Sequence, residues 1–564
     1  MTRTILVLAS ATLLMATRGF SWADAPQATG SPQSDMKSAP PDLARMDQMI
    51  RSFVANKKFM GAVLVARGND ILLDRGYGFA NLELNVPNSP KTKFRLGSIT
   101  KQFTAASILL LEERGKLNVD DRVKKYMPDA PAAWDQITIF NLLTHTSGIP
   151  NFTSFPDYAK LEPFPTSAAD LVARFRDKPL DFQPGEKWSY SNSGYVLLGY
   201  LIEKISGKSY AQFLEDNIFK PLGMVDSGYD SNSAVIENRA SGYAPTPNGM
   251  VNAGYIDMTV PLSAGGLYST TEDLLRWEQG LFGGKLLSPS SLKKMTTPFK
   301  NEYALGLAVH TVSGREEIEH TGGIEGFNTE LAYYPDEQLT VVVLANLNGP
   351  ASNEIAGNLH TLAEGGTVVL SSERTVAKID PEVFDGYVGS YQLAPHFVLK
   401  VRREGDRLIA QATGQEQIEI FPEDDHNFFA KVVDARITFV KNGQGRVTEL
   451  VLHQGGRDQH APRVDGAAAE PKGHKEIKVD PKILDGYLGT YQLAPGLSIR
   501  ITREGDHLFA QASNQARFEI FPESDRDYFY KVVDAQITFV TDARGQATEL
   551  ILHQAGDHHA GRVE

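Results

Sequence analysis

Hydrophobic and polar positions fall into distinct blocks along the first part of the chain. Residues 60–84, MGAVLVARGNDILLDRGYGFANLEL, contain two apolar runs on either side of RGND, and this pattern predicts a β-hairpin. The next block, residues 94–117, has the sequence FRLGSITKQFTAASILLLEERGKL. Its apolar side chains recur at helical spacing, at Ile99, Phe103, Ala106 and Leu110. Gly115 follows them and predicts the end of a helix.

The pattern changes twice after this helix. Residues from about 100 to 250 favour helices separated by loops such as THTSGIP and DFQPGEKWSYSNSGY. From about residue 305 the chain returns to apolar runs typical of strands, in ALGLAVHTV, EIEHTGGI, NTELAYYP and LTVVVLAN. Strand segments therefore flank a helical region, and the economical arrangement joins them in one antiparallel sheet with the helices inserted. We expect an α/β (α+β) domain over residues 43–365.

The last third of the chain contains an internal duplication. The segment IDPEVFDGYVGSYQLAP begins at Ile379, and VDPKILDGYLGTYQLAP begins at Val479. The same offset holds without a gap as far as ELVLHQ and ELILHQ. Each copy alternates short apolar runs with turn residues, which predicts two small all-β domains, each a barrel or a sandwich, at 375–460 and 476–564. Residues 461–475 are expected to form the linker.

The N-terminus has the pattern of a secretory signal peptide. Arg3 precedes an apolar run at 5–16, and the small residues Ser21 and Ala23 suit a cleavage site, so residues 1–23 are expected to be removed. The apolar run is shorter than the ~20 residues that span a bilayer. The Pro- and Ser-rich residues 24–42 are expected to be a flexible leader. These features predict a secreted or periplasmic protein with no stable membrane anchor.

Composition narrows the range of partners. The 564 residues carry a net charge of −13, which disfavours nucleic acid and anionic membranes as partners. The absence of cysteine excludes disulfides and thiol chemistry. The histidines of the tail, His453, His553, His558 and His559, lack the spacing and companions of a zinc site. We therefore expect neither a metal nor an organic cofactor.

The pattern S-x-x-K occurs four times in the chain, and the sequence around each occurrence distinguishes the candidate catalytic pair from the other three. Ser34–Lys37 lies in the leader, and the overlapping pairs Ser290–Lys293 and Ser291–Lys294 lie in the polar stretch LLSPSSLKKMTTP. Ser98–Lys101 begins an apolar helix, where positions i and i+3 share one face. A serine hydroxyl needs a base within ~3 Å to become a nucleophile. A buried lysine supplies one when its pKa is lowered.

Two further motifs follow in the same order along the chain. WSYSNSGY contains Tyr190-Ser-Asn192, the only Y-x-N, and EIEHTGGIEGF contains His320-Thr-Gly-Gly, the only H-T-G. A tyrosine could relay a proton with Lys101, and an asparagine could hold a substrate carbonyl or the lysine itself. Glycines at the end of a strand let a ligand approach the backbone closely. S-x-x-K with a polar second element and a K-T-G strand marks β-lactamases and penicillin-binding proteins.

Residues 43–365 resemble the serine β-lactamase/penicillin-recognising superfamily. They are most similar to the branch that contains class C β-lactamases, D-stereospecific aminopeptidases, DD-carboxypeptidases and esterases (peptidase family S12 type), including in LLTHTSGIP and SAGGLYSTTEDLLRW. The resemblance implies a nucleophile, a base and a shared acid/base, at Ser98, Lys101 and Tyr190. It implies substrate-binding positions at Asn192, His320, Thr321 and Gly322. It implies an oxyanion hole formed by the backbone N–H groups of Ser98 and Gly323. The repeated tail resembles lipocalin-like barrels.

The resemblance leaves several alternatives open. His320 stands where the family usually has a lysine, and a neutral imidazole holds a substrate carboxylate less well, which disfavours a β-lactamase proper. No E-x-x-L-N element supplies a second base, so deacylation would fall to Tyr190 and Lys101. His145 in LLTHTSGI is expected to be a structural residue at a helix end or in a loop rather than a catalytic one.

The sequence therefore predicts an exported serine hydrolase that forms an acyl-enzyme. Its expected substrates are small peptides or amides, with D-residues or from the cell wall, or carboxylic esters. The alternatives are a β-lactamase and a non-catalytic binding protein that keeps the penicillin-recognising fold. In the simplest interpretation, the residues that the two repeats share form the cores and turns of the barrels. The alternatives are that one barrel restricts the size of the substrate, or that both barrels bind cell wall or a protein. The oligomeric state stays open.

Overall fold

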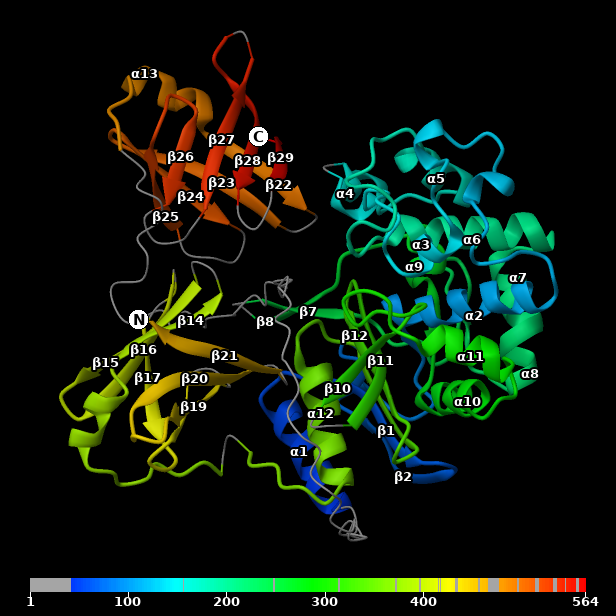
Figure 1. The fold of residues 1–564 in the computed structure, drawn as a ribbon, viewed down its shortest axis with the longest axis horizontal. Helices are drawn as coiled ribbons and strands as arrows, with labels where there is room; N and C mark the ends of the chain where they lie inside the picture. Colours follow the sequence, from blue (N-terminus) through cyan, green and yellow to red (C-terminus); the bar gives the residue numbers. More distant parts are fainter. Residues whose placement is uncertain are drawn as a thin grey trace, which may run out of the picture. The chain divides into compact units, whose positions relative to one another are not determined.

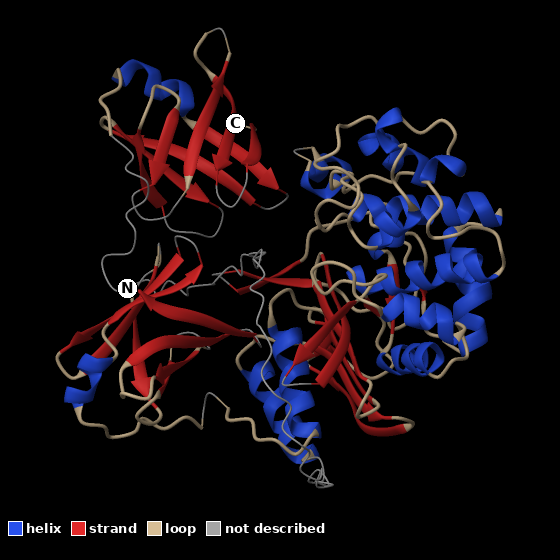
Figure 2. Cartoon of the chain, in the orientation of Figure 1, coloured by secondary structure: helices blue, strands red, loops and turns tan. Residues whose placement is uncertain are grey.

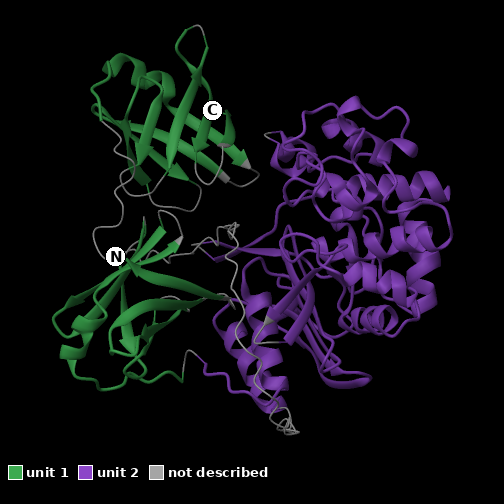
Figure 3. Cartoon of the chain, in the orientation of Figure 1, with its two compact units in different colours: residues 1–41, 373–454, 458–564 green, residues 42–372, 455–457 purple. Residues whose placement is uncertain are grey.

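The computed structural model describes two compact units, which Figure 3 shows in different colours. In chain order, the first unit is residues 42–372 with 455–457 (purple, keyed as unit 2 in Figure 3), and the second is residues 373–454 with 458–564 (green, keyed as unit 1). The described residues are 42–563 apart from 156, 247–248, 313–314, 371–372, 395–396, 414, 416, 432–434, 455–456, 465–475, 495–496, 513–516, 531–534, 543 and 554–556. The expected signal peptide, and the expected leader up to residue 41, lie outside this range. Asp42, placed in that leader, instead caps the first helix, where its side chain accepts from the N–H of Arg45.

The first unit is built on a six-stranded antiparallel sheet (Figures 1 and 2). In spatial order its strands are β10 (Ala308–Val312), β11 (Arg315–Ile324), β12 (Phe327–Tyr334), β13 (Leu339–Ala345), β1 (Gly61–Arg67) and β2 (Asp70–Tyr77). The predicted hairpin at 60–84 is confirmed as β1 and β2. The pairing of β1 with β13 confirms that the two ends of the domain meet in one sheet around an inserted helical region.

Helices cover both faces of this sheet, and the alternation of side chains along β1 shows how. Val63 and Val65 pack into a cluster with α1 (Leu43–Ala55) and α12 (Ala351–Ala363). Ala62 and Leu64 face the larger cluster, which contains the inserted helices. Both sets are fully buried, so β1 has a nearly continuous apolar sequence rather than an alternating one.

The inserted region contains most of the α-helices of this unit. Its helices are α2 (Thr100–Glu113), α3 (Ile139–Leu143), α4 (Tyr158–Leu161), α5 (Ala168–Arg176), α6 (Asn192–Ser206), α7 (Tyr210–Leu214), α8 (Lys220–Leu222), α9 (Leu262–Gly265), α10 (Thr271–Phe282) and α11 (Pro289–Thr296). Short strands accompany them: β3 (Phe79–Asn81), β4 (Val86–Pro87), β5 (Phe94–Arg95), β6 (Gly228–Tyr229), β7 (Tyr243–Thr246), β8 (Gly249–Asn252) and β9 (Leu267–Ser269). The expectation of helices up to about residue 250 was wrong for β7 and β8, which form a hairpin.

Helix α2 is the central helix of the inserted region. Every residue from Thr100 to Leu111 is buried, including polar side chains, so the helix is surrounded by protein on all sides. It ends at Glu113, and Gly115 then adopts a left-handed φ of 66°, as the sequence predicted. Ser98 lies in a 3₁₀ turn, Gly97–Ile99, that leads directly into α2. Lys101 therefore lies one turn after Ser98, on the first turn of the helix.

The duplicated tail forms two closed antiparallel barrels. In each, eight consecutive strands of the described chain lie side by side in sequence order, as in a lipocalin-like up-and-down barrel. The first contains β14 (Gly389–Ala394), β15 (Phe397–Glu404), β16 (Arg407–Ala412), β17 (Ile418–Pro422), β18 (Asn427–Ala430), β19 (Arg436–Lys441), β20 (Val447–Gln454) and β21 (Arg457–Val464). The second contains β22 (Gly489–Ala494), β23 (Leu497–Glu504), β24 (His507–Ala512), β25 (Arg517–Pro522), β26 (Asp527–Tyr530), β27 (Gln536–Thr541), β28 (Ala547–His553) and β29 (Asp557–Arg562), after the short helix α13 (Pro481–Leu484).

Two expected boundaries were too early. Strand β21 continues to Val464 and pairs with β14, so residues 461–464 close the first barrel and do not belong to a linker. The sequence RDQHAPRV hid this strand, because it is mostly polar and contains Pro462. At the other boundary, residues after 365 still pack on the first unit: Leu370 is buried in the cluster of α1 and α12. Among the described residues, no helix is long and apolar enough to cross a membrane.

Candidate active site

The structure brings Ser98, Lys101 and Tyr190 together. The Lys101 Nζ lies 3.0 Å from the Ser98 Oγ, and the Tyr190 hydroxyl donates to the same Oγ over 2.8 Å. Ser98 itself is partly exposed, whereas Lys101 has no exposed surface. The Oγ of a partly exposed serine thus lies between a buried amine and a phenol, which is the arrangement an activated nucleophile requires.

The surroundings of Lys101 favour its neutral form. Burial lowers the pKa of Lys101 well below its ordinary value. Besides Ser98, its Nζ contacts the Asn192 Oδ1 at 2.9 Å and the Ala264 carbonyl oxygen at 2.8 Å. A neutral amine has two N–H groups for these two acceptors and one lone pair left for the Ser98 proton. The three contacts therefore match the geometry of a general base directed at Ser98.

Asn192 is the first residue of α6, and its side chain is engaged on both sides. Its Oδ1 accepts from Lys101, and its Nδ2 donates to the Thr153 Oγ1 over 3.2 Å. Its backbone N–H donates to the Asn151 Oδ1 over 3.1 Å. Of the two roles that the sequence left open, the structure shows the contact with the lysine.

Strand β11 passes close to the turn that carries Ser98, and glycines make this approach possible. A Cβ on Gly322 would lie 1.9 Å from the Leu96 carbonyl oxygen, and a Cβ on Gly97 would lie 2.8 Å from the Gly323 N. Gly97 also has a left-handed φ of 54°. The Gly323 amide is therefore next to the Ser98 turn, where the predicted oxyanion hole requires it. Thr321, also predicted to bind substrate, is partly exposed on the same strand.

His320 forms a wall of the site. It is 5% exposed, its Nδ1 lies 2.6 Å from the Thr321 carbonyl oxygen, and its Nε2 lies 3.0 Å from the Tyr303 hydroxyl. The carbonyl can only accept, so Nδ1 carries the proton and Nε2 accepts from Tyr303. Burial, and secondarily the Lys101 amine, lower the pKa of His320 to about 4. The ring is therefore neutral at physiological pH, with both nitrogens occupied.

Several residues in contact with the site were not predicted from the sequence. Tyr303 reaches His320 from a loop, the Ala264 carbonyl reaches Lys101 from α9, and Thr153 supports Asn192. Of these three, only Ala264 lies in a sequence segment on which the family resemblance was based, SAGGLYSTTEDLLRW. His145, expected to be structural, lies with its ring centroid 4.4 Å from that of Tyr190.

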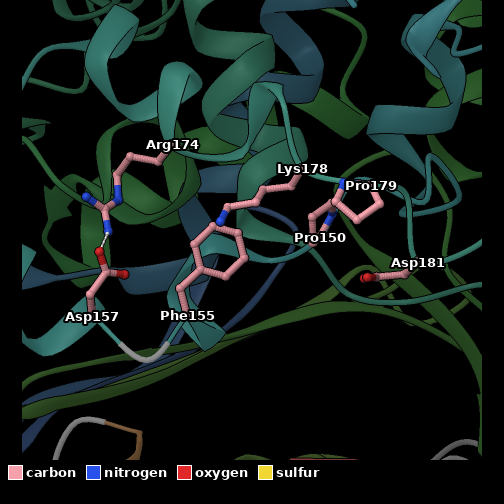
Figure 4. A pocket seen from close by; sticks show the side chains of 7 residues that line it. All are labelled: Pro150, Phe155, Asp157, Arg174, Lys178, Pro179 and Asp181. Carbon is pink, nitrogen blue, oxygen red and sulfur yellow. Dashed lines mark hydrogen bonds and ion pairs between the residues drawn. The ribbon is translucent and has the colours of Figure 1, made fainter. Parts of the chain in front are cut away.

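A pocket of about 500 Å³ lies near the start of α6 but does not include Ser98, Lys101 or Tyr190 (Figure 4). Its lining residues are Pro150, Phe155, Asp157, Arg174, Lys178, Pro179 and Asp181. Figure 4 shows the ion pair of Arg174 with Asp157, and Lys178 lies over the Phe155 ring with its Nζ 5.7 Å from the centroid. The loop that lines this pocket also supplies Thr153 to Asn192.

Among the described residues, no group of three or more His, Cys, Asp or Glu side chains could hold a metal ion, and this includes the histidines of the tail. His453 instead contacts the Thr438 Oγ1 at 2.9 Å, and His553 contacts the Thr538 Oγ1 at the same distance. The two barrels thus repeat the same polar contact.

Comparison with known families and proteins gives one consistent result for the first unit. Residues 46–364 match the family model described as Beta-lactamase, and residues 373–466 and 473–561 each match a domain of unknown function (DUF3471). Penicillin-binding protein 4* of Bacillus subtilis (strain 168) is 31% identical over 438 residues, covering 72% of this chain and 95% of that protein.

Solved structures give the same relationship. The penicillin-binding protein from Bacillus halodurans is 30% identical, with a TM-score of 0.51 over 56% of this chain and 99% of that one. The octameric penicillin-binding protein homologue from Pyrococcus abyssi is 26% identical, with a TM-score of 0.54 over 74% of this chain and 100% of that one.

We predict that Gly322→Ala damages both stability and the site. The new Cβ would overlap the Leu96 carbonyl, so β11 or the Ser98 turn must move, at a cost of about 1–3 kcal/mol. Thermal unfolding should show a lower Tm, and labelling of Ser98 by a fluorophosphonate should slow by about 10-fold or more. Gly357→Ala is the matched control, because nothing lies within 4 Å of a Cβ there. Equal behaviour of the two variants would contradict the close approach.

We predict a contribution of His320 to the pH dependence of stability. Its pKa of about 4 in the folded protein is below the value of ~6.5 in an unfolded chain, so the unfolded state binds the proton more tightly. This contribution is fully present above pH ~6.5 and is lost as the pH falls toward the folded pKa. Between about pH 7.5 and about pH 5, the Tm of the wild type should fall more than that of His320→Gln. Parallel curves would show that His320 does not titrate in this way.

Proposed function

The chain belongs to the β-lactamase family and is a β-lactamase-fold serine hydrolase related to penicillin-binding proteins, and on that premise we propose that it is an exported enzyme that forms an acyl-enzyme at Ser98. The proposed substrates are small peptides or amides, with D-residues or from the cell wall, and carboxylic esters. Export is proposed from the N-terminal sequence pattern alone.

The observation that carries this proposal is the placement of the Ser98 Oγ between the Lys101 Nζ and the Tyr190 hydroxyl. Oγ attacks the substrate carbonyl carbon while its proton passes to the basic pair formed by Lys101 and Tyr190. The carbonyl oxygen becomes an oxyanion, which the N–H groups of Ser98 and Gly323 stabilise. Removal of one such donor costs about 10²–10³-fold in rate in a comparable hydrolase.

The tetrahedral intermediate then collapses. The bond from carbon to the leaving nitrogen or oxygen breaks, and the leaving group takes the proton back from Tyr190, which leaves an ester on Ser98. Water attacks this ester, gives its proton to the same pair, and releases the acid while Ser98 recovers its hydrogen. Burial raises the pKa of Tyr190, so its phenol is protonated and ready to donate in the resting enzyme.

The state of His320 supports substrates whose recognition does not depend on a carboxylate. The neutral ring, with Nδ1 and Nε2 both occupied, offers no fixed cation at the His320 position of β11. A β-lactam antibiotic carries a carboxylate close to its reacting carbonyl, so turnover of β-lactams is less favoured than that of neutral amides and esters. The names of the relatives nevertheless make penicillin a suitable acylating probe. A purely non-catalytic binding protein would not need the Ser98, Lys101 and Tyr190 contacts.

We predict that Ser98→Ala abolishes both acylation and hydrolysis. Wild-type protein exposed to a penicillin should gain the mass of one drug molecule, and it should hydrolyse a p-nitrophenyl ester. Both signals should fall by about 10³-fold or more in Ser98→Ala. Ser290→Ala is the matched control, because Ser290 also precedes a lysine by three residues but is exposed on α11.

The outcomes separate the candidate functions. An adduct on Ser98 that persists supports the penicillin-binding type, whereas rapid release of hydrolysed drug would favour the β-lactamase. Ester hydrolysis without an adduct would favour the esterase. Unchanged activity in Ser98→Ala would overturn the proposal, and inactivity of the wild type on every substrate would leave the non-catalytic function.

A further inference from the structure

His145 is buried against the proposed catalytic residues but has no part in the mechanism described above. It is 1% exposed and follows α3, in a left-handed conformation with a φ of 57°. This conformation is uncommon for a residue with a side chain and costs of order 1–2 kcal/mol. Such a cost persists where the surrounding structure requires that residue, often at functional sites.

Three contacts connect His145 to Tyr190 and its two neighbours. The backbone carbonyl of His145 accepts from the N–H of Ser189 over 2.9 Å. Its Nδ1 accepts from the N–H of Ser191 over 3.1 Å. Its ring lies against Tyr190, with 4.4 Å between the ring centroids. The residues immediately before and after Tyr190 are thus both held by His145, and the Tyr190 ring rests on the imidazole.

The hydrogen bonds also fix the tautomer of His145. An amide N–H can only donate, so Nδ1 is the acceptor and the proton of the neutral ring is on Nε2. Burial, and secondarily the nearby Lys101 amine, lower the pKa of His145 well below its ordinary value. Among the described residues, no hydrogen-bond partner lies within reach of the buried Nε2. A buried polar atom without a partner costs about 1–3 kcal/mol, which a simple packing residue at this position would avoid.

Tyr190 needs such support because its own segment has no regular structure. Residues 187–191 are extended loop, and α6 begins only at Asn192. The 2.8 Å contact from the Tyr190 hydroxyl to Ser98 therefore depends on restraints from outside the segment. A displacement of about 1 Å in a catalytic group can lower the rate by about 10²-fold.

We propose that His145 is a positioning residue for Tyr190, which its Nδ1 and its ring hold within hydrogen-bonding distance of Ser98. This inference rests on the proposed function, in which Tyr190 transfers the proton. His145 does not touch the substrate. It acts by fixing the backbone on both sides of Tyr190 and the plane of the phenol.

The test compares two substitutions that remove different parts of the contact. His145→Phe keeps a ring but removes the acceptor for the Ser191 N–H. His145→Asn keeps an acceptor oxygen near the position of Nδ1, suits a positive φ, and removes the ring. His360→Asn is the control, because the His360 ring also stacks on a tyrosine, Tyr334, at 3.8 Å, and its Nε2 is likewise buried without a partner among the described residues.

The readouts are the kcat and KM for a p-nitrophenyl ester, the rate of fluorophosphonate labelling at Ser98, and the Tm. We expect His145→Phe to lower kcat and the labelling rate by about 10–100-fold, with KM changed by less than about 3-fold. His145→Asn should recover most of the loss in kcat, and His360→Asn should leave kcat unchanged even where the Tm falls.

The inference is overturned if folded His145→Phe keeps the wild-type kcat, if its defect is in KM alone, or if His360→Asn lowers kcat equally. If His145→Phe does not fold, His145→Asn is compared with His145→Ala, which removes both the acceptor and the ring: a kcat and labelling rate about 10-fold or more lower in His145→Ala than in His145→Asn support the proposal, and equal values in the two folded variants contradict it. Labelling of the wild type that is lost in Ser98→Ala shows that the nucleophile is correct whatever His145 does. Failure of the inference is therefore distinguishable from failure of the proposed function.

Discussion

The burial of one lysine organises the first unit. Lys101 has no exposed surface, and its Nζ lies within 3.0 Å of Ser98, Asn192 and the Ala264 carbonyl. An ammonium ion in this position would lose its hydration, so burial favours the neutral amine, which is also the form that can take a proton from Ser98. The three contacts come from three separate elements: the 3₁₀ turn Gly97–Ile99, α6 and α9. Their packing therefore determines whether a base exists at all.

This constraint explains why α2 is buried on every side. The sheet forms the opposite wall of the site, because β11 passes close to the Ser98 turn. A side chain on Gly322 would collide with the Leu96 carbonyl. The sheet itself is held by β1 and β13, segments 272 to 284 residues apart that pair in register from Gly61–Ala345 to Arg67–Leu339. The site is thus built on rigid elements, while Tyr190 reaches it from a loop.

Sequence alone could predict the features that depend on local pattern. The hairpin of β1 and β2, the helix after Ser98 and the repeated barrels all follow from periodicity or duplication. Ser98, Lys101, Tyr190 and Asn192 were found because each belongs to a short motif, and the structure brings all four together. Tyr303 and Thr153 could not be found in this way, because a single side chain from a loop has no periodic signal. Strand β21 was misplaced for a similar reason, since its polar residues and Pro462 resemble a linker.

The charges of the site give a further constraint on the chemistry. When Ser98 attacks, the proposed mechanism creates an oxyanion and, on the basic pair, a positive charge. His145 and His320 both lie close enough that Lys101 lowers the pKa of each, so a protonated imidazole at either position would repel the developing ammonium. Their burial keeps both rings neutral and leaves the single new cation to pair with the single new anion. A site arranged in this way stabilises charge that forms during the reaction rather than charge that a substrate already carries. A neutral His320 in place of the lysine usual in this family is consistent with that arrangement.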